Sequence, residues 1–180
     1  LMPFHAGCDV EAVYLLGAFG VRIDGTVPAL TELPERLQAG DVTRQGLPFY
    51  GGTITYGIDP ASLTEAFELL DAVRLGDDRV AVALADFEAG TVRMRAGSRE
   101  RQLPWAPFEA DIASGDTLEI DLVLTRRNTF GPLHQWPLHA PSYGPDNWVT
   151  EGDRFRETYV LLPSGLLEAP RLVRKRPIAE

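Results

Sequence analysis

At 180 residues, 44% of them hydrophobic, the chain suits one domain with its own core. Its formal net charge of −9, from 17 basic and 26 acidic residues, repels phosphate backbones and excludes nucleic acid as an expected partner. No apolar run approaches the roughly 18 to 20 residues that span a bilayer, so no membrane partner is expected. The lone Cys8 excludes an internal disulfide and fits a cytoplasmic or a secreted bacterial protein. The chain begins with Leu1 and not with methionine, so we expect a fragment of a longer chain. We expect a single domain over residues 1–180.

The first third of the chain predicts short strands and a long connection. Apolar runs broken by glycine predict two strands within residues 10–23. Residues 24–45 are polar and contain prolines, which indicates a surface connection, with one short helical candidate at 30–38. A strand with alternating apolar residues follows at 47–58. Residues 59–70 fit either a short helix capped by Ser62 or a strand from Ala66.

The middle of the chain shows the period of two that marks a strand with one buried face. Residues 79–87 and 91–96 alternate in this way, as do residues 108–112 and 118–124. The turn at Ser114, Gly115 and Asp116 predicts that the last two strands form an antiparallel hairpin. Glu119 and Asp121 fall on the outer face, where solvent is expected, and Trp105 is expected in the core. A last strand at 158–162 and a basic tail at 171–176 complete the chain, and together these elements predict an all-β, two-sheet antiparallel β-sandwich.

Several stretches resemble the jelly-roll, galactose-binding-like domain of bacterial glycoside-hydrolase-like proteins, of the type that binds sugar in beta-galactosidase-like enzymes. These are LPFYGGT at residues 47–53 and the strands at 105–112 and 118–123. The RN and GPxH pairs within 127–134, together with YLLGxFG at 14–20, resemble a subgroup of glycosidase-like proteins. The similarity spans residues 10–167, although RAGS at 95–98 replaces the Val-Asn-Gly turn common in such domains. The resemblance implies a jelly roll without its own catalytic carboxylates, because these lie in a separate barrel domain of the parent enzyme.

The proline-rich loop after the last long strand gathers aromatic rings and planar hydrogen-bonding groups. Sugar rings present apolar C–H faces to aromatic side chains and hydroxyl groups to polar ones. The same residues also suit a structural role, in which the rings close the end of the sandwich and the polar groups brace the loop. The candidate carbohydrate-binding residues are Arg127, Asn128, His134, Trp136, Tyr143 and Trp148.

Metal and catalytic sites are weakly indicated. His134 and His139 are five residues apart in a loop, which matches no zinc pattern, and no metal site or cofactor is predicted. The resemblance allows a structural calcium ion, to which Asp77 with Asp78, or Asp146 with Asn147, could contribute.

The leading functional prediction is a non-catalytic accessory module that binds carbohydrate or packs against the catalytic domain of the same parent chain. One alternative is a free-standing sandwich-fold enzyme, cupin-like or a lyase or glycosidase, working from Glu151, Glu157 and His134. Another is a purely structural interaction domain.

Overall fold

The computed structural model describes residues 14–71, 79–139 and 144–176. Within these ranges the chain forms nine strands and two α-helices. The strands are β1 (Gly20–Asp24), β2 (Val27–Thr31), β3 (Thr53–Ile58), β4 (Arg79–Ala83), β5 (Thr91–Ala96), β6 (Arg99–Leu103), β7 (Glu109–Asp111), β8 (Leu118–Val123) and β9 (Arg171–Lys175). The helices are α1 (Pro60–Asp71) and α2 (Arg127–Phe130), with single 3-10 turns at Val42–Arg44 and Pro145–Asn147.

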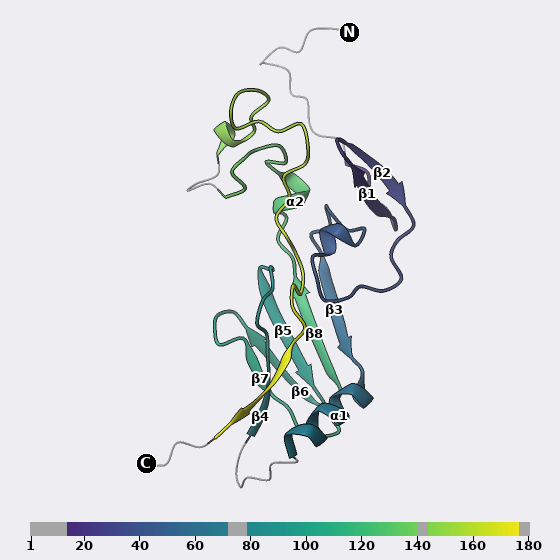
Figure 1. The fold of residues 1–180 in the computed structure, drawn as a ribbon, viewed down its shortest axis with the longest axis vertical. Coiled ribbons are helices and arrows are strands. Elements are labelled where there is room, and N and C mark those ends of the chain that lie inside the picture. The colour runs from purple at the N-terminus through teal and green to yellow at the C-terminus, as the bar shows by residue number, and fades with distance from the viewer. Residues whose placement is uncertain (1–13, 72–78, 140–143, 177–180) are drawn as a thin grey trace.

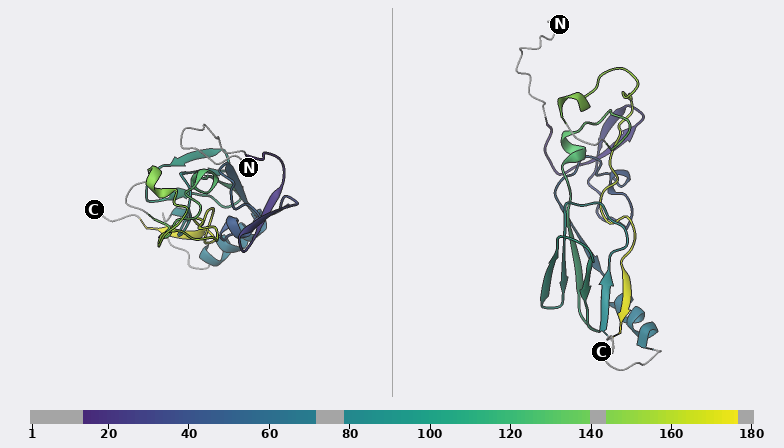
Figure 2. Two further views of the ribbon diagram at one scale, coloured as in Figure 1. Left: turned by 90° about the horizontal axis from the view of Figure 1, so that it is seen from above. Right: turned by 90° about the vertical axis from the view of Figure 1, so that its left-hand side faces the viewer.

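All strand pairs are antiparallel and fall into three sheets. A four-stranded sheet has the order β3-β8-β5-β6, a three-stranded sheet has the order β7-β4-β9, and β1 and β2 form a separate hairpin. The molecule is elongated, with the two larger sheets and α1 towards one end and α2 and the β1–β2 hairpin towards the other (Figure 1). The two larger sheets face each other as layers (Figure 2). The chain is therefore mostly β with antiparallel sheets, in an arrangement compatible with the predicted sandwich.

One hydrophobic core lies between the two larger sheets. Its members are the apolar residues at alternate strand positions, as the period of two predicted. They include Ile54, Val92, Met94, Ile120 and Leu122 from the four-stranded sheet and Val82 and Ala110 from the three-stranded sheet.

The predicted hairpin of residues 108–112 with 118–124 is wrong. β7 pairs with β4, whereas β8 lies between β3 and β5 in the other sheet. The turn between β7 and β8 is closed by the Asp116 N–H, which donates to the Ala113 carbonyl at 3.1 Å, and it carries the chain across the core. Both strands point apolar side chains into the same core, so alternation does not distinguish a neighbour in one sheet from a strand in the facing sheet.

Expectations for the two ends of the chain also need correction. No helix forms at residues 30–38, because the connection contains β2, which pairs with β1. Residues 14–19 are irregular and only β1 forms from the first stretch, while residues 10–13 lie outside the described part of the chain. The basic tail is strand β9, which pairs with β4, and residues 158–162 are irregular instead of forming the last strand.

One strand was not predicted from the sequence, and two side chains differ in exposure from what the sequence predicted. β6 (RERQL) has mostly exposed residues because it is an edge strand that pairs only with β5, and no alternation predicted it. Trp105 is exposed and lies outside the core, contrary to expectation. Asp121 is only 2% exposed, although it lies on the outer face of the sheet.

Asp121 is buried by the side chains that it binds. Its carboxylate accepts hydrogen bonds from Thr55 Oγ1 at 2.7 Å, from Arg93 Nη2 at 2.6 Å and from Arg95 Nη1 at 2.7 Å. Burial raises the pKa of Asp121, but these hydrogen bonds together outweigh burial and hold its pKa below the usual range. The group is a structural cross-link between β3, β5 and β8.

The ambiguous segment after β3 is the helix α1. The Asp59 carboxylate accepts hydrogen bonds from the Ser62 N–H and hydroxyl, at 3.0 and 3.1 Å, so Asp59 caps the helix where Ser62 was expected to do so. Leu63 and Phe67 are buried against the core. None of the helices in the described ranges combines the length and apolarity needed to cross a bilayer.

Candidate functional site

The loop region that follows β8 begins with α2 and is anchored by Asn128. The Asn128 amide donates to the Leu162 carbonyl at 2.7 Å and accepts from the Leu162 N–H at 2.9 Å. These two hydrogen bonds tie the backbone of Leu162 to α2. Asn128 is buried, and the guanidinium nitrogens of Arg127 are also shielded from solvent. Both side chains therefore lie inside the protein, where they suit the structural role that the sequence left open.

His134 packs between elements of the same loop region. Its Nδ1 lies 3.0 Å from the carbonyl oxygen of Arg156, so the tautomer protonated on Nδ1 donates a hydrogen bond there. Its ring centroid is 4.9 Å from that of Tyr159 and 5.9 Å from that of Phe155. None of the described contacts joins His134 to Glu151 or Glu157, the carboxylates of the enzyme alternative.

Trp136 and Trp148, here called the tryptophan pair, remain available to a ligand. They are 52% and 53% exposed. Trp148 Nε1 donates to the Phe130 carbonyl at 3.3 Å, which ties its indole to the end of α2. The Trp136 backbone N–H donates to the Arg154 carbonyl at 2.7 Å. Each tryptophan is thus held by one hydrogen bond to the backbone of a neighbouring segment, while about half of its surface is in contact with solvent.

A buried amide contact joins the two tryptophan-bearing segments. The residue before each tryptophan is buried: Gln135 precedes Trp136, and Asn147 precedes Trp148. Asn147 Nδ2 donates to Gln135 Oε1 at 2.8 Å, and the Gly144 N–H donates to Asn147 Oδ1 at 2.7 Å. Sequence reasoning missed Gln135, because nothing in a proline-rich loop shows that its amide is buried. Tyr143 and the Asp77 and Asp78 pair lie outside the described residues.

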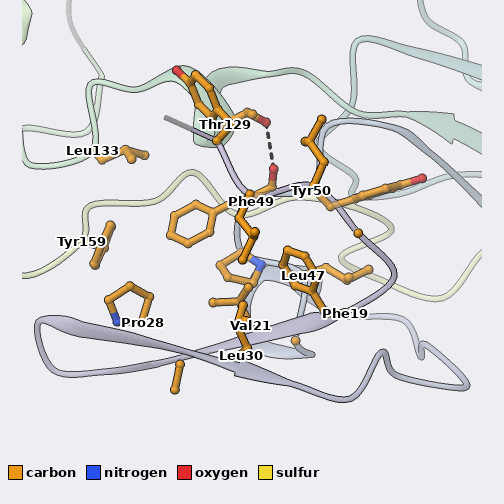
Figure 3. Close-up of a pocket in the computed structure, with 17 residues that line it drawn as sticks. Phe19, Val21, Pro28, Leu30, Leu47, Phe49, Tyr50, Thr129, Leu133 and Tyr159 are labelled. Atoms are coloured by element: carbon orange, nitrogen blue, oxygen red, sulfur yellow. Dashed lines mark hydrogen bonds between the residues drawn. The ribbon is translucent and has the colours of Figure 1, made fainter. Parts of the chain in front are cut away.

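A pocket of about 510 Å³, here called the apolar pocket, lies next to the start of the loop region that follows β8. Figure 3 shows Val21, Pro28 and Leu30 of the β1–β2 hairpin pointing towards Phe49 and Leu47 across it. Residues 14–17 and Thr129, Leu133 and Tyr159 contribute to its walls, and none of the lining residues that the structure describes is charged. The Thr129 hydroxyl donates to the Phe49 carbonyl at 2.8 Å and holds two walls together.

The pocket brings together stretches that are far apart in the sequence. YLLGxFG at 14–20, LPFYGGT at 47–53 and the segment at 127–134 all contribute lining residues. The structure therefore gives them a shared location, which the sequence alone did not.

Comparison of the chain with protein-family models, curated proteins and solved structures gave no match. Among the described residues, no three His, Cys, Asp or Glu side chains are grouped so as to hold a metal ion. At the second calcium candidate, the Asn147 amide is engaged by Gln135 and Gly144, and the Asp146 carbonyl accepts from Arg154 Nη2 at 3.0 Å.

Proposed function

We propose that this chain is a non-catalytic accessory module of a glycoside-hydrolase-like protein and that it binds carbohydrate on the tryptophan pair. The proposal includes a jelly-roll, galactose-binding-like fold, for which the antiparallel sheets and the resemblance of residues 47–53, 105–112 and 118–123 are the support. Its ligand is a sugar with an apolar ring face.

The observation that carries the proposal is the contrast between exposed indoles and buried amides. Trp136 and Trp148 expose about half of their surface, whereas the Gln135–Asn147 contact beneath them is buried. A buried amide pair restricts the loop before any ligand arrives, so less conformational entropy is lost on binding. Aromatic rings held in this way give a large apolar contact area, which suits the C–H face of a pyranose ring.

The proposal is tested with a glycan array followed by titration of the sugars that bind. Truncation of a stacking indole removes a large share of a weak affinity. Trp136→Ala or Trp148→Ala should therefore abolish millimolar binding, on the order of 4 kcal/mol in total. The melting temperature should hardly move, because both rings are half exposed. Trp105→Ala is the matched control, since Trp105 is an exposed indole outside the loop region.

A structural role for the loop predicts the opposite result: the tryptophan variants lose stability, and no glycan binding is lost. A buried tryptophan that is truncated costs roughly 3 to 5 kcal/mol of stability. A large fall in melting temperature, together with no glycan bound by the wild type, would therefore overturn the proposal.

The non-catalytic part is tested separately. The chain alone should show no turnover on a panel of aryl glycosides. Turnover that survives repurification and disappears in Glu151→Gln or Glu157→Gln would instead establish the enzyme alternative.

A further inference from the structure

Trp148 is linked to the apolar pocket through the backbone carbonyl of Phe130 and through the ring contact of Phe130 with Tyr14. Trp148 Nε1 binds the Phe130 carbonyl at 3.3 Å. The Phe130 ring packs edge-on against Tyr14, with ring centroids 5.4 Å apart. Tyr14 in turn lines the apolar pocket, as does Thr129, the residue before Phe130. Phe130 and Tyr14 both expose nearly half of their surface. A ligand on Trp148 can therefore extend along aromatic surface into the pocket.

The chemistry of the pocket defines what it can hold. Its volume of about 510 Å³ is within the range of roughly 300 to 1,000 Å³ that is typical of small-molecule sites. The described part of its lining is mostly aromatic and aliphatic and contains no charged residue. Of the four hydroxyl groups among its lining residues, two are engaged with the backbone, since Thr129 donates to the Phe49 carbonyl and Tyr50 donates to the Thr53 carbonyl. The pocket thus suits an uncharged alkyl or aryl group and is poorly suited to a sugar ring.

We infer that the apolar pocket receives the apolar aglycone of an amphipathic glycoside whose sugar lies on the tryptophan pair. The inference rests on the proposed carbohydrate function and specifies its ligand class. A second copy of the chain is the disfavoured occupant, because two molecules with a net charge of −9 each repel one another.

The test compares methyl and octyl β-galactoside, and methyl and octyl β-glucoside, with the octyl compounds kept below their micelle-forming concentrations. Affinity is measured by calorimetric titration. Burial of even two methylene groups corresponds to about a tenfold gain in affinity, so the octyl glycoside should bind at least about ten times more tightly than its methyl counterpart.

Two variants place a charge at the pocket without disturbing the core. Leu30→Glu alters the β2 wall, where Leu30 is 60% exposed, and Leu16→Glu alters the rim, where Leu16 is 89% exposed. Each should reduce the octyl advantage to less than about threefold. The affinity for the methyl glycoside and the melting temperature should be unchanged. Trp105→Ala, which removes an exposed apolar side chain outside the pocket, should retain the full octyl advantage.

The outcomes separate this inference from the function on which it rests. Equal affinity for methyl and octyl glycosides, or an octyl advantage that survives both charged variants, overturns the inference and leaves the sugar site intact. Octyl binding that depends on Leu30 but not on Trp148 supports the pocket and overturns the carbohydrate function. Dimerisation in sedimentation velocity that Leu30→Glu abolishes, without any octyl preference, assigns the pocket to a second copy and overturns the inference.

Discussion

Asn147→Ala tests whether the buried amide contact holds the tryptophan pair in place. The substitution removes the donor to Gln135 Oε1 and the acceptor for the Gly144 N–H, while both indoles remain. A buried polar group that loses its partner costs about 1 to 3 kcal/mol. Water that enters the space left by the shortened side chain can satisfy one of the two groups, so we expect a net cost of about 2 kcal/mol.

That cost should appear in the loop region and in ligand affinity. If the segments separate in the free protein, a cost of about 2 kcal/mol corresponds to roughly a thirtyfold loss of affinity for any glycan that binds both tryptophans. Hydrogen exchange at the Trp136 N–H, which is bonded to the Arg154 carbonyl, should accelerate by a similar factor. Exchange in the β5 and β8 strands should not change, because these strands belong to the four-stranded sheet.

The matched control is Asp146→Ala. Asp146 is exposed, and its contact with Arg154 uses the backbone carbonyl, which alanine retains. This variant should bind and exchange as the wild type does. If Asn147→Ala also bound glycans with wild-type affinity and left the exchange of Trp136 unchanged, the amide contact would not organise the site, and the reasoning from it would fail.

Two further predictions concern strand β8 of the four-stranded sheet, and both are measured by urea unfolding. Leu122 is 0% exposed, and Leu122→Asp should lower the free energy of unfolding by at least about 4 kcal/mol, because a buried leucine is lost and an unpaired charge is introduced. The control is Val123→Asp, which should lower it by less than about 1 kcal/mol, because Val123 is 39% exposed on the opposite face of the strand. Asp121→Asn should lower the free energy of unfolding by about 2 to 3 kcal/mol, which is less than for a fully buried ion pair because the arginines that bind Asp121 are partly exposed. The control is Glu119→Gln, which should lower it by less than about 1 kcal/mol. Because the folded-state pKa of Asp121 is lowered, its contribution is present above the unfolded pKa of about 3.9 and is lost as the pH falls through the folded-state value. The wild type should therefore lose its advantage over Asp121→Asn in acid, and an advantage that stayed constant down to pH 2 would contradict the assignment.

The sequence predicted the buried faces of the strands far better than their neighbours. Alternation at residues 54–58, 91–96 and 118–124 marked the side chains that form the core. It gave no information on whether two such strands share a sheet, and for that reason β7 and β8 were paired wrongly. The sequence did not predict β6, because an edge strand needs no apolar face. It predicted a tail where β9 forms, because the basic residues of β9 are typical of a solvent-exposed tail.

For the candidate site, composition identified the aromatic residues but not their supports. Trp136 and Trp148 stand out in any reading of the loop, and the structure exposes both. Burial of Gln135 depends on contacts with Asn147, twelve residues away, and no local pattern encodes such a contact. The pocket needed three separate stretches of chain to meet, which only the folded structure reveals.

The loop region also shows why polar residues were harder to interpret than aromatic ones. This part of the chain has little regular structure, yet buried backbone groups must still form hydrogen bonds. Polar side chains supply them: Asn128 binds the backbone of Leu162, Asp41 accepts from the Ser164 N–H at 3.2 Å, and Asn147 accepts from the Gly144 N–H. Asn128 and Asn147 are also buried, so a sugar hydroxyl cannot reach their amides unless the loop opens. Asn128 and Asn147 are consequently engaged in the structure of the loop, whereas Trp136 and Trp148 keep about half of their surface exposed, although Trp148 Nε1 also donates to the Phe130 carbonyl.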